Sequence, residues 1–252
     1  MAIRVFAAGS LRAAFGELAA VFEAGRGVPV ELVFGPSGLL RDRLLNGEAA
    51  DVFASANMEH PRALAANGIA GPVRCFAHNC LCALAAPGLR ISSETLVERL
   101  LDPAIRLGTS TPKVDPSGDY AFEFFARAEG RYPGAQARLV AKAMTITGGP
   151  SSPPPPPGRN LYAKLIEDGA ADIFLTYRSN ALQARREAPT QQIVPIPDDL
   201  AVGADFGLAV LGLGNAAGAF ADFVLSAAGQ AILVRQGFSP LHSEVKAYPA
   251  LA

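Results

Sequence analysis

Residues 5–64, VFAAGSLRAAFGELAAVFEAGRGVPVELVFGPSGLLRDRLLNGEAADVFASANMEHPRAL, alternate short apolar runs with helical patterns. From Leu11, apolar residues recur at i, i+4, i+7, i+8 and i+11, which marks one face of a helix. Similar patterns predict a helix after Gly38 and another near residues 59–66. A buried strand is predicted at residues 3–8, and further strands at residues 28–34 and 51–55. This β-α-β-α-β-α order is typical of a mostly parallel sheet with helices on both faces.

The alternation of strands and helices restarts near residue 90 and continues to the end of the chain. Residues 205–211 form the last predicted strand, and helices near 217–226 and 229–235 follow it. No internal repeat is evident. The sequence therefore predicts an α/β protein with two α/β lobes.

Composition narrows the class of protein. Of 252 residues, 50% are apolar and 18% are charged, and the net charge is −1 with no long basic or acidic block. This balance supports a sizeable core and gives no electrostatic case for nucleic acid or an anionic membrane. No apolar stretch reaches the roughly 18 residues of a membrane-spanning helix.

Three cysteines, Cys75, Cys80 and Cys82, have the spacing C-x4-C-x-C, which matches no zinc motif. Only His78 lies close enough in sequence to join them. We expect buried free thiols and no metal site or cofactor, with one disulfide and an odd thiol as the alternative.

Three predicted strand-to-helix turns carry a serine near the start of the helix, at Ser10, Ser37 and Ser117. Such turns line the carboxyl edge of an open α/β sheet, where ligands bind. A helix start offers unpaired N–H groups and the positive end of the helix dipole, and a serine adds a neutral donor. The three serines together predict an anion site. The alternative is that each serine only caps its helix.

Catalytic motifs are weak. Residues 35–38, GPSG, differ from the G-x-S-x-G nucleophile elbow, and no histidine is placed to activate Ser37. Asp115 and Asp119 flank Ser117, but acidic residues are common in turns and first helical turns. We expect no catalytic residues.

A run of five prolines, residues 153–157, precedes Gly158, Arg159 and Asn160. Proline has no N–H to donate, so donors in this region must come from the three residues after the run. A stiff polyproline segment would hold the next helix start in place. We expect it to form a wall beside the ligand, with Arg159 and Asn160 at its rim.

Residues 5–64 resemble the N-terminal part of the periplasmic molybdate-binding proteins of bacterial ABC importers. The matching motifs are AGSL (8–11), FGPSG (34–38) and DVFASA (51–56). The likeness continues weakly through DPSGDYA (115–121), GAADIFLTYRSNA (169–181) and LSAAGQAILVRQGF (225–238), and so covers nearly the whole chain.

The resemblance implies a type II periplasmic binding protein, in which two α/β lobes are joined by two crossover strands with a ligand cleft between them. Lobe 1 would comprise residues 1–81 and 206–252, and would hold both termini. Lobe 2 would comprise residues 82–205.

The resemblance also implies ligand-binding residues. Ser10 and Ser37 align with two serines that bind the oxyanion through hydroxyl and backbone N–H groups. Ser117 falls where the family uses a backbone N–H at a helix start, and Tyr177 aligns with a tyrosine whose hydroxyl donates. Counting back from Tyr177 places the last backbone donor at Arg159, with Asn160 as an N-cap or a polar contact.

Arg159 departs from the family, which has a neutral residue there. If its side chain points outward, the expected ligand is molybdate or tungstate, bound by neutral donors. If it points inward, its guanidinium fork suits a carboxylate or a phosphorylated metabolite.

The leading hypothesis is a non-catalytic, monomeric binding protein that delivers a small oxyanion to the permease of an ABC importer. The resemblance implies a periplasmic location, with the signal peptide absent from this sequence. The other hypotheses are the same fold binding another anion, the effector domain of a regulator, or an enzyme core. No helix-turn-helix pattern precedes Ile3, which argues against a complete DNA-binding regulator.

Overall fold

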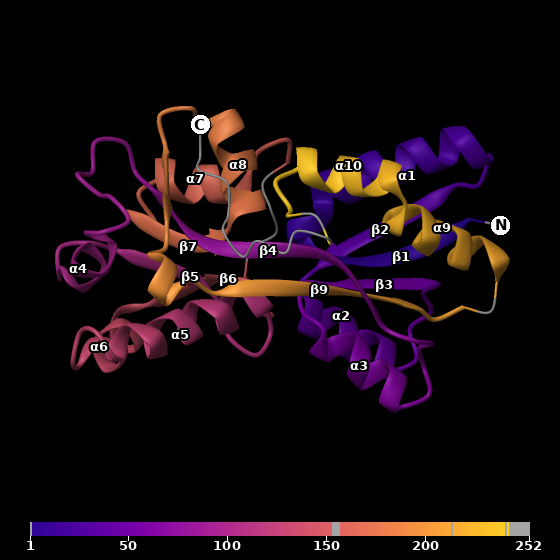
Figure 1. Ribbon diagram of the computed structural model, residues 1–252, viewed down its shortest axis with the longest axis horizontal. Helices are drawn as coiled ribbons and strands as arrows, with labels where there is room; N and C mark the ends of the chain where they lie inside the picture. Colours follow the sequence, from indigo (N-terminus) through magenta and orange to yellow (C-terminus); the bar gives the residue numbers. More distant parts are fainter. Residues whose placement is uncertain (1, 153–156, 213, 240, 242–252) are drawn as a thin grey trace. The chain divides into compact units, whose positions relative to one another are not determined.

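A computed structural model describes residues 2–152, 157–212, 214–239 and 241. The chain divides into two compact units, Met1–Asn79 with Ala204–Ala252 (unit 1) and Cys80–Gly203 (unit 2). It passes between the units twice, once within β4 (Arg74–Ala85) and once within β9 (Gly203–Val210). Strands pair with one another within each unit, and helices pack on them (Figure 1).

Unit 1 is built on a sheet with the strand order β2-β1-β3-β9. β1 pairs in parallel with both β2 and β3, and β9 is antiparallel to β3. Its elements are β1 (Ile3–Ala8), the 3-10 turn η1 (Gly9–Leu11), α1 (Arg12–Arg26), β2 (Val30–Gly35), α2 (Ser37–Leu45), β3 (Val52–Ser55), α3 (Glu59–Ala66), the first part of β4, β9, α9 (Asn215–Leu225) and α10 (Ala227–Arg235).

Helices cover both faces of this sheet, as the sequence pattern predicts. α1, α9 and α10 lie on one face, and α2 and α3 on the other (Figure 1). The apolar stripe of α1 is buried, and the rings of Phe15 and Phe22 meet Phe220 of α9 with centroids 6.2 and 5.2 Å apart. Edge-to-face contacts of this kind add to the apolar burial that stabilises the unit.

Unit 2 has the strand order β4-β7-β5-β6, with β8 also pairing with β4. β5 is parallel to β6 and β7, and β4 is antiparallel to β7 and β8. Its elements are the second part of β4, α4 (Leu96–Leu101), β5 (Leu107–Ser110), α5 (Pro116–Glu129), α6 (Ala135–Lys142), β6 (Met144–Thr147), α7 (Leu161–Glu167), β7 (Ile173–Tyr177), α8 (Arg178–Glu187), β8 (Gln192–Pro195) and η2 (Asp198–Leu200). One core lies under α4, α5 and α6, and a second lies under α7 and α8.

Two details differ from the sequence prediction. Strand β6 was not predicted, because it is short, lies at the edge of the sheet, and alternates Met144 and Ile146 with two threonines over only four residues. None of the three serines is an N-cap: α1, α2 and α5 are capped by Leu11, Pro36 and Asp115. The interpretation of these serines as helix caps is therefore wrong.

Within the described residues, no single helix is long and apolar enough to cross a membrane. Only α9 and α10 taken together reach the necessary length and hydropathy, and they are bent by 60° at their junction. Both helices have residues buried in the core of unit 1.

Removing the cap of α10 is expected to lower stability modestly. Ser226 is the N-cap, and its Oγ accepts a hydrogen bond from the Gly229 N–H at 3.2 Å. Ser226→Ala should cost about 1 kcal/mol, because an N–H of the first turn loses its acceptor. Urea unfolding measures the loss, and Ser226→Asp, which keeps an acceptor, is the control that should retain the wild-type midpoint.

Candidate anion-binding residues

The carboxyl ends of β1 and β2 bring Ser10 and Ser37 to one edge of the sheet of unit 1. In the parallel register of these strands, Ala8 is opposite Gly35. Ser10 and Ser37 each follow two residues later, at the start of η1 and α2. The edge where ligands bind in open α/β sheets therefore carries both serines.

Ser10 has a hydroxyl without a partner. Its Oγ is shielded from solvent and makes no hydrogen bond within the described part of the chain. A buried hydroxyl normally finds a partner, because leaving it unpaired costs about 1–3 kcal/mol. A ligand that accepts a hydrogen bond from Ser10 would remove this cost.

Ser37 is held in an orientation that suits a donor. It is the first residue of α2 and is 1% exposed. Its Oγ accepts a hydrogen bond from the Ala56 N–H at 3.1 Å, at the end of β3. Since that N–H occupies a lone pair of the oxygen, the hydroxyl proton points elsewhere and remains available to an acceptor.

Neither η1 nor α2 has a side-chain cap at its start. The first N–H groups of a helical segment have no partner within the helix and carry its positive partial charge. Together with the two hydroxyls, this edge of unit 1 is suited to binding an anion.

Arg12 adds a cation that the sequence analysis did not single out. It is the first residue of α1, and its guanidinium lies over the Phe34 ring, 4.5 Å from the centroid. Burial lowers the pKa of Arg12, and among the described residues no carboxylate offsets this shift. The helix dipole disfavours a cation at a helix N-terminus, so the position of Arg12 is not explained by the stability of α1.

In unit 2, the parallel strands β7, β5 and β6 end in a polar cluster. Ser117 Oγ donates to Ser110 Oγ at 2.8 Å, and Ser110 Oγ lies 2.9 Å from Thr147 Oγ1. Tyr162 hydrogen-bonds with Ser110 and Thr176, whose Oγ1 also accepts from Asn180 Nδ2 at 3.0 Å. The sequence analysis identified Ser117 here but not the hydroxyls around it.

Asp115 occupies the start of α5. Its Oδ1 accepts the Ser117 N–H at 3.1 Å, so the backbone donor that the resemblance assigns to the anion is already bonded to a carboxyl group. Burial raises the pKa of Asp115, and its hydrogen bonds with Ser117 and Ser110 offset this only in part. A dianion binding at the Ser117 N–H would meet this carboxyl group.

Two glycines allow close packing near the start of α5. A Cβ on Gly118 would lie 2.6 Å from the carbonyl oxygen of Ser110. Gly148 has φ of +74°, and a Cβ there would lie 2.6 Å from Asp115 Oδ2. Only glycine fits at either position without movement of the backbone.

Tyr177 ends β7, where the sequence analysis placed a ligand-binding hydroxyl. It is 1% exposed, and burial raises the pKa of its phenol well above the ordinary value. Its ring meets the edge of Tyr120, with centroids 6.1 Å apart. The phenol therefore stays protonated at neutral pH and keeps its proton as a donor.

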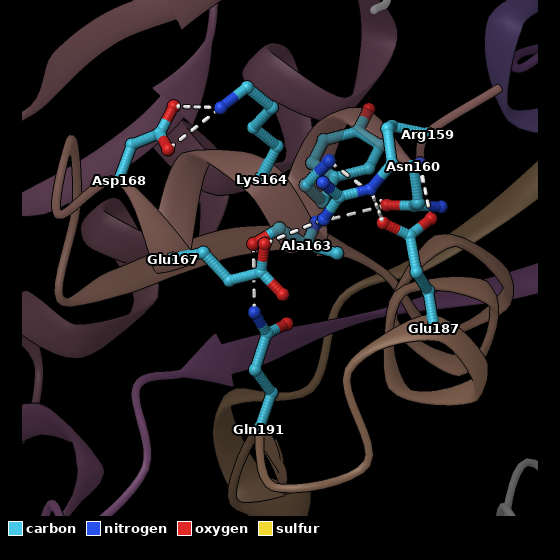
Figure 2. A network of polar contacts seen from close by, with 9 residues as sticks. Arg159, Asn160, Ala163, Lys164, Glu167, Asp168, Glu187 and Gln191 are labelled. Carbon is cyan, nitrogen blue, oxygen red and sulfur yellow. Dashed lines mark hydrogen bonds and ion pairs between the residues drawn. The ribbon is translucent and has the colours of Figure 1, made fainter. Parts of the chain in front are cut away.

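Asn160 caps α7, one of the two roles expected of it. Its Oδ1 accepts hydrogen bonds from the backbone N–H groups of Tyr162 and Ala163, both at 3.0 Å. The Asn160 N–H in turn donates to Glu187 Oε2 at 2.6 Å (Figure 2). Asn160 therefore fixes the start of α7 against the end of α8.

The side chain of Arg159 is engaged by two carboxylates. Its guanidinium pairs with Glu167 of α7 at 2.6 Å and with Glu187 of α8 (Figure 2). The side chain is 44% exposed. Of the two alternatives, this geometry favours the one in which Arg159 points away from the ligand.

The proline run lies mostly outside the described residues. Pro153 to Pro156 are not described, so the expectation that the run forms a wall beside the ligand is not addressed by the structure.

Arg159→Ala is expected to leave anion affinity within about twofold of wild type, because the two glutamates already neutralise the guanidinium. Calorimetric titration with molybdate measures this. Lys164→Ala, which removes the neighbouring ion pair with Asp168, is the matched control. If Arg159→Ala lowers anion affinity tenfold or more and Lys164→Ala does not, Arg159 binds the ligand.

The family described as bacterial extracellular solute-binding protein matches residues 3–239 of this chain. The chain belongs to this family. It is 40% identical over 208 residues to the uncharacterized protein PM1146 of Pasteurella multocida, covering 82% of this chain and 86% of that one. It is 31% identical over 250 residues to the molybdate-binding protein ModA of Mycobacterium bovis, covering 94% and 84%. The resemblance to molybdate-binding proteins is thus confirmed.

Solved structures of solute-binding proteins share the fold. The periplasmic molybdate-binding protein of Azotobacter vinelandii has a TM-score of 0.76 at 18% identity, covering 94% of this chain and 98% of that one. The sulfate-binding protein SubI of Mycobacterium tuberculosis has a TM-score of 0.77 at 20% identity, covering 96% and 88%. PEB3 with bound L-phospholactate has a TM-score of 0.72 at 15% identity, covering 94% and 98%. The expected α/β fold of a type II periplasmic binding protein is confirmed, and the family is one of transport and not of catalysis.

Proposed function

We propose that this solute-binding protein captures a tetrahedral oxyanion, molybdate or tungstate, and delivers it to the permease of an ABC importer. The relative with 31% identity is named for molybdate binding, which supports this ligand. The proposed ligand residues are Ser10 and Ser37 of unit 1 and Ser117 and Tyr177 of unit 2. We further propose that the protein acts as a monomer in the periplasm.

The observation that carries the proposal is the pair of serine hydroxyls at the edge of the sheet of unit 1. Ser10 Oγ is buried with no partner in the described chain, and Ser37 is oriented by Ala56 with its proton available. Hydrogen bonds to a charged acceptor are stronger than neutral ones, so two such donors offset part of the cost of desolvating a dianion.

A thermal-shift screen tests the ligand class. Molybdate, tungstate, sulfate, phosphate and small carboxylates are compared at equal ionic strength, and calorimetry follows for each hit. We expect molybdate and tungstate to raise Tm most, because a ligand that binds only the folded state stabilises it. A shift with an organic acid and none with molybdate or tungstate would overturn the proposal.

A carboxylated or phosphorylated metabolite is the second candidate, and Arg12 is the observation in its favour. Arg12 follows Ser10 by two residues, its guanidinium lies over the Phe34 ring, and it has no carboxylate partner among the described residues. Such a fork suits bidentate binding of carboxylate or phosphate. The solved neighbour with bound L-phospholactate shows that the fold accommodates a ligand of this kind.

Substitutions of Arg12 separate the two candidates. If the ligand is molybdate and Arg12 supplies only its charge, Arg12→Lys should keep affinity within about threefold, and Arg12→Ala should weaken it in a salt-dependent way. If Arg12 holds a carboxylate as a fork, Arg12→Lys should lose as much affinity as Arg12→Ala. Titrations of both variants at low and high salt give the comparison.

A further inference from the structure

Three side chains of unit 1 that take no part in the proposed anion site lie together. They are Cys75 and His78 of β4 and Asp205 of β9. One ligand atom from each, a thiol sulfur, an imidazole nitrogen and a carboxylate oxygen, all lie within 4.8 Å of one another. Cys75 and His78 are half-buried, and Asp205 is exposed.

The sequence of β4 places Cys75 and His78 on the same side. Residues three apart in a regular strand point to opposite faces. Here Phe76 and Ala77 are both fully buried, although they are adjacent, and the residues on either side of them are not. The rest of β4, residues 79–85, is buried without alternation, whereas Cys75 and His78 are only half-buried and their ligand atoms lie within 4.8 Å of each other.

Both strands are anchored at this point. The Phe76 ring contacts Phe206 of β9, with centroids 6.2 Å apart. His78 forms a β-bridge with Ser239, in which the Ser239 N–H donates to the His78 carbonyl at 2.8 Å. The three ligand atoms are thus carried by a fixed backbone and not by a loose surface loop.

We propose that Cys75, His78 and Asp205 form a binding site for a divalent transition-metal ion, with zinc as the best match. Thiolate, imidazole and carboxylate are the three protein ligand types of zinc, and a water molecule would complete a tetrahedral set. An anion site would instead need donors or cations, whereas a carboxylate and a thiolate are anionic ligands that suit a cation.

The present distances need only a small adjustment. His78 Nδ1 and Asp205 Oδ1 lie 2.7 Å apart, bridged by a hydrogen bond. Two ligand atoms of tetrahedral zinc lie about 3.3–3.5 Å apart, from bond lengths of about 2.0–2.2 Å. The Asp205 carboxylate is exposed, so it can move outward until its oxygen lies at the larger distance from His78 Nδ1 that a zinc site requires. The ion would then replace the shared proton, and Cys75 would bind as the thiolate and release its own proton.

Cobalt serves as the spectroscopic probe. The full chain, freed of metal by a chelator, is titrated with Co²⁺ and then with Zn²⁺. We expect one ion per chain, an ultraviolet thiolate-to-cobalt charge-transfer band, and loss of that band when zinc displaces cobalt. Cys75→Ser should abolish the band, and Asp205→Asn should weaken cobalt binding by at least about tenfold.

Matched controls isolate the cluster. Cys80→Ser removes a thiol outside it and should keep the band. Asp222→Asn removes an exposed carboxylate of the same unit, which pairs with Arg74, and should leave cobalt affinity unchanged. Circular dichroism shows whether Cys75→Ser folds. If it does not, the test is the difference in cobalt affinity between Asp205→Asn, which should bind more weakly, and Asp222→Asn, which should not. Absence of a stoichiometric ion, or a band that survives Cys75→Ser, would overturn the proposal.

Discussion

Ser10→Ala is expected to lower oxyanion affinity by about tenfold to a hundredfold without destabilising the ligand-free protein. A hydrogen bond to a charged acceptor contributes about 1.5–3 kcal/mol, and each 1.4 kcal/mol is a factor of ten in Kd. Ser10 Oγ has no partner in the described chain, so alanine removes no bond from the ligand-free state. Removal of a buried, unpaired hydroxyl should leave Tm unchanged or raise it.

Ser37→Ala and Ser55→Ala distinguish loss of a ligand contact from loss of stability. Ser37→Ala also removes a donor to the anion, and it breaks the hydrogen bond that Ser37 Oγ accepts from the Ala56 N–H, so both affinity and stability should fall. Ser55→Ala is the control: Ser55 is buried and bonded to Asn57, and its loss should lower stability only. Calorimetry gives the affinities and thermal melts the stabilities. If Ser10→Ala binds molybdate as wild type does, the hydroxyl is not a ligand.

The fold could be predicted where periodicity was strong. The apolar stripe of α1 and the buried strands β1 and β3 follow directly from the spacing of their apolar residues. β2 was also predicted as a strand, although none of its six residues is fully buried. Strand β6 could not be predicted, since four residues are too few to establish a pattern of alternation. The helix caps were misassigned for a related reason: which residue caps a helix depends on the backbone angles that precede it, as at Pro36.

Parts of the site depend on contacts between residues far apart in sequence. Nothing in the sequence near Arg159 shows that Glu187, 28 residues later, holds its side chain. Arg12 acquires its place by stacking on Phe34, which the neighbouring strand supplies. Local motifs therefore indicated the serines, whereas tertiary packing determines which charged groups can act on a ligand.

Asp115→Asn is expected to tighten binding of a dianion by about tenfold or more at neutral pH. The carboxyl group accepts the Ser117 N–H that the anion is predicted to use, and a like charge within a few ångströms opposes binding. Asparagine is an equally good N-cap, so the start of α5 should be kept. Titrations of both proteins with molybdate at the same pH measure the change. Asp119→Asn, in the same helical turn, is the control and should have the smaller effect.

The pH dependence of this substitution has a definite sign. Burial, aided by the charge of Asp119, raises the pKa of Asp115, so the folded protein holds this proton more tightly than the unfolded chain. Asp115 therefore supports stability below its unfolded pKa, and this support is lost as pH rises through its folded pKa. The Tm of Asp115→Asn relative to wild type should consequently increase from acid to neutral pH, and its advantage in affinity should grow over the same range. Protonation of the anion itself affects its binding to both proteins equally, so it cancels in the ratio of their affinities at each pH. Equal affinities at neutral pH would show that Asp115 does not face the bound anion.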